Sequence, residues 1–182
     1  MQRKGEKMLN ATYNELRKNV YPLTINITSN GKLEKMGRYD RSVCVIDPDS
    51  KPPTGNRGER FALFELVHLN RRVSNSEANK ALGKLGYYPA DIYALLTFGM
   101  HYPYVPSIFP IAGIAYSLKV YYRHTRPREF EMVGLPFLIG DGKDRVFDFK
   151  IEDGEWSEMT RFLVTRDRAM KTGGLMKFWK WW

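Results

Sequence analysis

The segment from Arg71 to Pro103 constrains the fold most, because it carries the start and stop signals of two consecutive helices. Ser74 and Glu77 form a capping box, in which each residue satisfies a backbone amide of the other at a helix N-terminus. Apolar residues then recur every three or four positions until Gly86, a residue favoured where a helix ends in a left-handed conformation. The first helix is therefore predicted over 74–86.

A second helix is predicted directly after a tight turn. Pro89 is favoured in a first helical turn, and apolar residues recur at helical spacing from Ile92 until Pro103 closes the run. This helix is predicted over 90–101. Two amphipathic helices in sequence form a scaffold, and they specify no reaction.

Strand patterns lie on both sides of the helix pair. Before it, 21–28 alternates apolar with polar residues, which predicts a half-buried strand. The run 60–69 is apolar nearly throughout, which suits a central strand covered on both faces. Further strand-like segments are 41–46, 109–118, 120–122, 132–139, 147–151 and 161–166. This order predicts an α+β fold, a mostly antiparallel sheet with the two helices packed on it.

The length of 182 residues suits one domain, and 43% hydrophobic residues argue for a folded globule. We expect a single α+β domain over 21–167, an N-terminal extension over 1–20 and a basic, Trp-rich tail over 168–182. The start of the chain is charged and resembles no signal peptide, and the single Cys44 cannot form an intrachain disulfide. A cytoplasmic location without an integral membrane segment is expected.

The net charge of +9 is concentrated in two stretches of the chain. Residues 119–128 contribute +4, and the six basic residues from Arg161 to the end face only Asp167. The rest of the chain is balanced, with 19 basic and 19 acidic residues. Any electrostatic function is therefore expected in these two stretches.

Both stretches place cations beside aromatic rings. In the first, arginines alternate with tyrosines and can contact phosphates and stack on bases, unless the tyrosines of a solvated loop pack inward. In the tail, Trp beside Lys suits a partner's pocket, a membrane interface or base stacking, unless the tail covers an apolar groove of its own domain. The predicted nucleic-acid or partner-binding residues are Lys119, Tyr121, Tyr122, Arg123, His124, Arg126, Arg128, Arg166, Arg168, Lys177, Trp179 and Trp181.

The chain carries no recognised catalytic or metal motif. His68, His101 and His124 lie on different predicted elements, with no carboxylate at zinc-ligand spacing. His68 is interpreted as a structural histidine with a hydrogen-bond partner, and Cys44 as an inert core thiol. No metal and no cofactor are expected.

Several motifs between 21 and 167 follow one another in an order seen elsewhere. They are Tyr39 to Arg41, Phe64 to Arg71, Val73 to Ala78, Gly86 to Ala90, Leu95 to Gly99, Tyr102-Pro103, Phe109 to Ile111, Trp156, Arg161-Phe162 and Val164 to Arg166. Together they resemble an uncharacterised family of small bacterial proteins, which implies a domain boundary and no mechanism. This chain has Ala112-Gly113-Ile114 where members usually carry Leu-Gly-Ser.

A second resemblance, carried by fewer residues, is to the C-type-lectin-like and formylglycine-generating-enzyme fold. In that fold a Gly-x-x-Pro helix start precedes a looped sheet, a Trp-containing hairpin and a Phe-x-x-Val-Arg strand. Gly86, Pro89, Leu95 and the run from Phe162 to Arg166 match in part, whereas Asp91 and Ala94 do not supply the Glu that usually precedes the Leu of this helix start. The resemblance implies loops that bind protein or carbohydrate. The chain lacks the paired cysteines of the enzyme and a lectin-type calcium motif.

These observations rank three functions. The first is a non-catalytic binding module for an anionic partner, with nucleic acid favoured, that uses the basic aromatic loop and the C-terminal tail. The second is a lectin-like interaction module that binds protein or carbohydrate. The third is an enzyme whose site is assembled from residues scattered in the sequence. The first hypothesis requires the two basic stretches to share one face.

Overall fold

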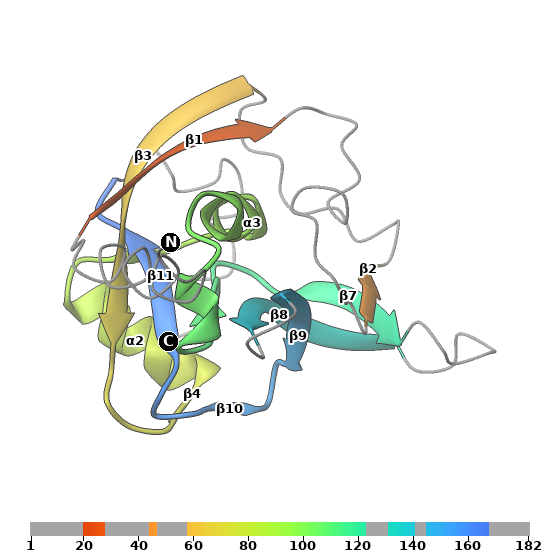
Figure 1. Cartoon of the computed structure of the whole chain (residues 1–182). Coiled ribbons are helices and arrows are strands. Elements are labelled where there is room, and N and C mark those ends of the chain that lie inside the picture. The colour runs from red at the N-terminus through yellow and green to blue at the C-terminus, as the bar shows by residue number, and fades with distance from the viewer. Residues whose placement is uncertain (1–19, 28–43, 47–57, 123–130, 141–144, 168–182) are drawn as a thin grey trace, which may run out of the picture.

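The computed structural model describes residues 20–27, 44–46, 58–122, 131–140 and 145–167 (Figure 1). The strands of this part are β1 (Tyr21–Ile27), β2 (Cys44–Ile46), β3 (Gly58–His68), β4 (Val73–Ser74), β5 (Tyr88–Pro89), β6 (Ile111–Ala112), β7 (Leu118–Tyr122), β8 (Glu131–Gly140), β9 (Arg145–Ile151), β10 (Glu155–Trp156) and β11 (Arg161–Thr165). The helices are α2 (Asn75–Lys84), α3 (Ile92–His101) and the short 3-10 helix η2 (Val105–Ser107). The α+β prediction is confirmed.

One sheet joins most of these strands in the order β1-β3-β11-β6-β8-β7-β2, with β5 also paired to β11 and β9 to β8. The pairs are antiparallel except for the parallel pair of β11 with β6, so the predicted antiparallel character holds for the described strands. A separate antiparallel pair joins β10 to β4. The last described strand therefore lies in the middle of the sheet.

Strand β8 runs through Pro136 without interruption because it changes partner there. Its residues up to Gly134 pair with β7, and Phe137 and Leu138 pair with β6, while β9 lines the other edge. Proline has no backbone N–H to donate to a ladder, so the gap between two partner strands is a favourable place for it.

The first helix begins as its capping box predicts. The Ser74 hydroxyl accepts a hydrogen bond from the Glu77 amide at 3.3 Å, and the Glu77 carboxylate accepts one from the Ser74 amide at 2.9 Å. The helix ends at Lys84, two residues before the predicted end, and Gly86 follows with φ of +78°. A positive φ is the conformation that favours glycine after a helix.

The second helix begins later than predicted, and the role expected for Pro89 is wrong. Pro89 lies in β5, where it pairs with Val164 of β11. Asp91 is the N-cap of α3, and its carboxylate accepts a hydrogen bond from the Ala94 amide at 2.8 Å. Pairing with β11 holds Pro89 in an extended conformation, and Asp is a strong N-cap, so the helix starts at Ile92.

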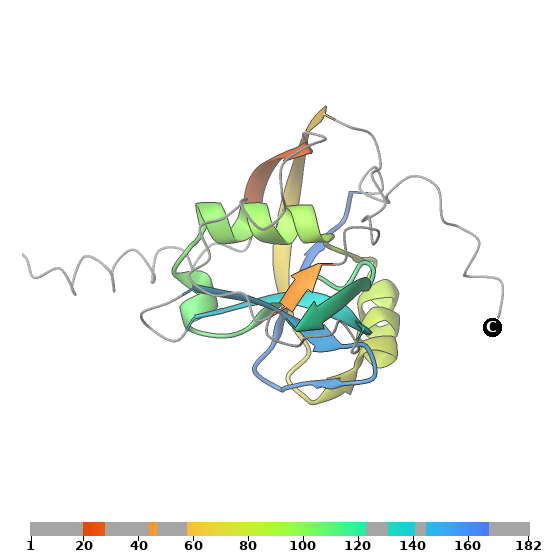
Figure 2. The same ribbon diagram turned by 90° about the vertical axis from the view of Figure 1, so that its right-hand side faces the viewer.

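Two hydrophobic cores lie on opposite sides of the sheet. Helix α3 packs between two groups of strands, β1 and β3 on one side and β8 and β9 on the other (Figures 1 and 2). Its core includes Leu96 and Phe98 and the inward side chains of those strands. The second core joins Leu82 of α2 to Trp156 of β10 and Phe162 of β11.

Strand β3 is central in the sheet, but only part of it is covered on both faces. Ala62 and Phe64 are buried on the α3 side, whereas Phe61 and Leu63 on the outer side are 64% and 51% exposed. Further along, Val67 packs against the core that contains Trp156. The prediction of a strand covered on both faces is therefore wrong for the first half of β3, because the second core does not extend that far.

A buried amide connects α2 to the segment around β10. The side chain of Asn75 accepts a hydrogen bond from the Trp156 indole N–H and donates one to the carbonyl of Glu152. The Trp156 ring also packs edge-on against Phe137 and Phe162, with 6.0 Å between centroids in each pair. Asn75 thus satisfies two polar groups of a segment about 80 residues away in sequence.

We expect Asn75→Ala to lower the free energy of unfolding by about 1–3 kcal/mol, because the buried indole N–H would lose its partner. Urea denaturation followed by circular dichroism measures this loss. The matched control is Ser76→Ala, since Ser76 is the exposed neighbour on the same helix. Equal stability of the two variants would contradict the role assigned to Asn75.

Candidate functional site

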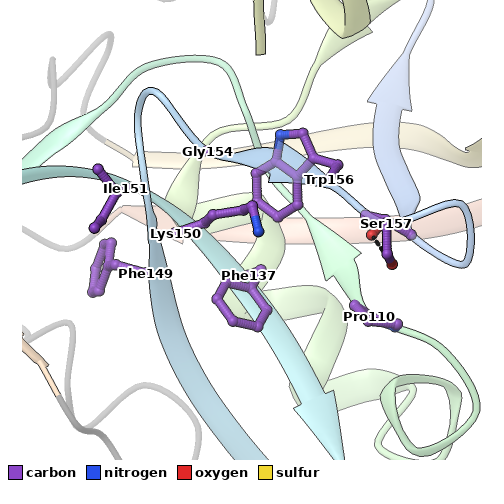
Figure 3. Close-up of a pocket in the computed structure, with 9 residues that line it drawn as sticks. Pro110, Phe137, Phe149, Lys150, Ile151, Gly154, Trp156 and Ser157 are labelled. Carbon is purple, nitrogen blue, oxygen red and sulfur yellow. Dashed lines mark hydrogen bonds between the residues drawn. The ribbon is translucent and has the colours of Figure 1, made fainter. Parts of the chain in front are cut away.

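A cleft of about 400 Å³ opens beside the turn that connects β9 to β10 (Figure 3). It is lined by Pro110, Phe137, Phe149, Lys150, Ile151, Gly154, Trp156, Ser157 and Thr160. Its walls come from four regions of the chain: the segment before β6, strand β8, strand β9 and the segment from Gly154 to Thr160. The cleft is therefore a product of tertiary structure.

Alternation along β9 places Lys150 at this cleft. Phe147 and Phe149 point into the core around α3, so Lys150 points to the opposite face of the sheet. Its ammonium lies 5.5 Å from the centroid of the Trp156 ring, and Figure 3 shows the side chain reaching toward that ring. Gly154 leaves room for this path, since a Cβ atom there would lie 3.1 Å from Cε of Lys150.

A second cation, Arg161, follows the cleft residue Thr160, but its side chain points to the α3 face of the sheet, as that of Leu163 does, and not into the cleft. Its backbone amide donates a hydrogen bond to the carbonyl of Pro110 at 2.9 Å, and its guanidinium lies 4.7 Å from the centroid of the Phe109 ring. Partial burial lowers the pKa of Arg161, but an arginine stays protonated at neutral pH. Within the part of the chain that the structure describes, neither Lys150 nor Arg161 forms an ion pair.

The polar groups of the cleft are Lys150 and two hydroxyls. The hydroxyls of Ser157 and Thr160 lie 3.1 Å apart and form a hydrogen bond with each other. Among the described residues that line the cleft there is no carboxylate, histidine or cysteine.

The structure places only part of the predicted binding set. Lys119 is exposed on β7, where it pairs with Val133 of β8, and Tyr121 and Tyr122 belong to the same strand. Arg166 directly follows β11. The remaining predicted residues lie outside the described ones: Arg123, His124, Arg126, Arg128, Arg168, Lys177, Trp179 and Trp181. Whether the two basic stretches share a face stays a prediction.

Arg166 takes part in a local cluster with Glu65 and Tyr87. Its Nε lies 3.2 Å from the Glu65 carboxylate, and its Nη2 donates a hydrogen bond to the Tyr87 hydroxyl at 2.6 Å. That hydroxyl donates in turn to Glu65 at 2.8 Å, and the Glu65 hydrogen bond raises the pKa of Tyr87. The charge of Arg166 is paired here, so the cluster holds the end of β11 against β3 and the turn after α2.

A buried polar cluster lies at the start of α3. Asp91 is 5% exposed, and Oδ2 of its carboxylate lies 3.7 Å from Nη2 of Arg60. Burial raises the pKa of Asp91, although the Ala94 amide and Arg60 act in the opposite direction. Burial also raises the pKa of Tyr116, whose hydroxyl has no hydrogen-bond partner among the described residues. We assign this cluster to the stability of the α3 core.

The remaining predictions concern the role of His68, metal binding and membrane-spanning segments. The His68 ring lies 2.5 Å from the carbonyl of Glu158, which agrees with its interpretation as a structural histidine. Among the described residues, no group of three or more His, Cys, Asp or Glu side chains is arranged to hold a metal ion. None of the helices in this part has the length and apolar character needed to cross a bilayer.

Comparisons with family models, with curated proteins and with solved structures find no match for this chain. The resemblances to the small bacterial family and to the lectin-like fold therefore stay predictions. The site must be interpreted from its own residues.

Sequence reasoning missed the cleft because its residues form no motif. Lys150 belongs to an alternating strand, where a charged residue between aromatic ones indicates only a solvated face. No local signal connects Lys150 to Trp156 and Pro110, which come together only in the folded chain.

The raised pKa of Asp91 predicts a pH dependence of stability. The folded state binds this proton more tightly than the unfolded chain, whose Asp pKa is about 4. The stability that Asp91 contributes is therefore fully present below about pH 4 and is lost as pH rises through the raised pKa. Asp91→Asn keeps a capping side chain and removes the titration.

We expect the unfolding free energy of Asp91→Asn, relative to the unmodified chain, to increase as the pH rises above about 4. Guanidinium denaturation at several pH values in this interval measures the difference. Glu77→Gln is the control, since Glu77 is exposed and the Ser74 amide lowers its pKa, so the difference for this variant should vary little over the same interval. A difference for Asp91→Asn that does not vary with pH would contradict the assignment.

Proposed function

We propose that this chain is a non-catalytic binding module for an anionic partner, and that the partner is single-stranded nucleic acid. The observation that carries the proposal is the cleft, where Lys150 lies beside the Trp156 ring without an ion pair among the described residues. Proteins that bind single strands combine cations for the phosphates with apolar rings for the bases.

The volume of the cleft supports a ligand of about the size of one nucleotide. Its volume of about 400 Å³ falls within the range of small-molecule sites. Trp156 is only 2% exposed, so it holds the Lys150 ammonium and cannot itself be the stacking surface. The accessible apolar surface on the Lys150 side belongs to Phe137, which is half-buried. A base would lie against this ring while its phosphate meets Lys150.

In this hypothesis the basic loop contacts further phosphates along the strand of nucleic acid. A single nucleotide gives little affinity, and binding of single strands is strengthened by further phosphate contacts. The surplus charge of residues 119–128 would supply those contacts. Strand β7, which leads into that loop, pairs with the same strand β8 that contributes Phe137 to the cleft.

The alternative is a lectin-like interaction module that binds protein or carbohydrate. It is supported by the order of the elements: the Trp156 segment precedes strand β11, which is the order that the resemblance to the C-type-lectin-like fold implies. The Lys150 ammonium at the cleft favours an anionic ligand over a neutral sugar.

We expect Lys150→Gln to weaken the binding of a labelled single-stranded oligonucleotide and to lower the slope of log affinity against log salt by roughly 0.7, the loss of one phosphate contact. Fluorescence anisotropy titrations at several salt concentrations measure both quantities. Lys84→Gln is the matched control, because Lys84 is exposed at the end of α2, outside the cleft lining.

Two results would overturn the proposal. Absence of binding by the unmodified chain at low salt removes nucleic acid as the partner. Equal affinity and equal salt slope for Lys150→Gln and Lys84→Gln remove the cleft as the site. Binding of a neutral oligosaccharide at the cleft, lost in Phe137→Ala, would favour the lectin-like alternative instead.

A further inference from the structure

The outer face of β1 and β3 is apolar and open. Phe61 and Leu63 project from this face of β3 and are 64% and 51% exposed. Pro22 of β1 is exposed and pairs with Leu63, so it extends the same surface. We call these three residues the outer patch. Adjacent large apolar side chains on an open sheet face are unfavourable in water and mark a surface that something covers.

The described chain ends beside this patch. Strand β11 pairs antiparallel with β3, with Thr165 opposite Phe64, and Figure 1 shows the two strands side by side. The Thr165 hydroxyl donates a hydrogen bond to the Leu63 carbonyl at 2.8 Å and accepts one from the Asp167 amide at 3.1 Å. The last residues of the described chain therefore lie next to Leu63. Because β11 is antiparallel to β3, it runs toward the end of β3 that carries Phe61.

The cluster of Arg166 with Glu65 and Tyr87 fixes the position at which the chain leaves the sheet after β11. The guanidinium of Arg166 lies 4.1 Å from the centroid of the Tyr87 ring and is paired with Glu65 of β3. Because Glu65 follows Leu63 by two residues, the two side chains lie on the same face of β3. The cluster thus fixes the last described residues beside the face that carries the outer patch.

We propose that the C-terminal segment 168–182, which lies outside the described residues, docks its aromatic end on the outer patch. This end carries Phe178, Trp179, Trp181 and Trp182. Ten residues separate Asp167 from Phe178, and an extended chain of that length spans up to roughly 35 Å. The distance from Leu63 to Phe61 along the strand is only about 7 Å, so the segment can reach the patch and fold back on it.

The composition of the chain favours this occupant over its rivals. Residues 1–19 also meet the sheet at β1, but they carry a single aromatic residue, Tyr13. The C-terminal segment carries three tryptophans in its last four residues, and each buried aromatic ring removes about 150–250 Å² from water. The two glycines at 173 and 174 permit the change of direction that docking requires.

Tryptophan fluorescence of the full chain tests the proposal. Trp156 is 2% exposed, so emission that acrylamide can quench reports on the three tryptophans of the segment. We expect the double variant Phe61→Ser, Leu63→Ser to shift the emission to longer wavelength and to raise the quenching constant severalfold. The matched control is Leu85→Ser, Met159→Ser, whose side chains are 54% and 52% exposed on other elements and whose emission should stay unchanged.

Three outcomes would overturn it. The first is emission from the unmodified chain that is already as quenchable as that of free tryptophan. The second is the same spectrum for the patch variant and the control variant. The third is protection that disappears on dilution, which assigns the patch to a second copy of the chain. Circular dichroism of both variants establishes that they are folded. Folding is expected because the substituted side chains are exposed.

Discussion

The insertion of β11 between β3 and β6 is the constraint on which the rest of the structure depends. Its antiparallel pairing with β3 and parallel pairing with β6 connect the two halves of the sheet. Leu163 belongs to the core around α3, and Phe162 and Val164 belong to the core that contains Trp156. Both cores therefore need the last described strand, and the sheet cannot close before the chain reaches Thr165. Such non-local pairing predicts slow folding relative to a helical protein of this size.

Local signals in the sequence were sufficient to predict the helices but not the strand partners. The Ser74 and Glu77 side chains lie three residues apart, and their capping box forms as the spacing indicates. The role of Pro89 was mistaken because its partner Val164 lies 75 residues away and no local pattern reports that contact. For the same reason an apolar run predicts that β3 is central, but does not reveal which of its side chains a second layer covers.

The candidate site was even less predictable, because its chemistry is assembled from distant residues. Counting charges identifies the basic stretches, but it does not show that Glu65 neutralises Arg166 across 101 positions. Conversely, Lys150 lies in a segment of balanced charge, so a count of charges does not identify it. It becomes a candidate binding residue only because its ammonium lies over the Trp156 ring in the folded chain. The value of a cation to a partner depends on its unpaired state in the fold, and the sequence alone does not display that state.

The central proposal is that an anionic strand binds at the cleft, where the Lys150 ammonium approaches the Trp156 ring. The most direct test is a titration of the ¹⁵N-labelled chain with a short single-stranded oligonucleotide at low salt, followed by amide chemical shifts. The account predicts that the amides of Lys150, Ser157 and Thr160 shift progressively and return when salt is added. Shifts confined to elements away from the cleft, such as α2, or no shifts at all, would contradict it.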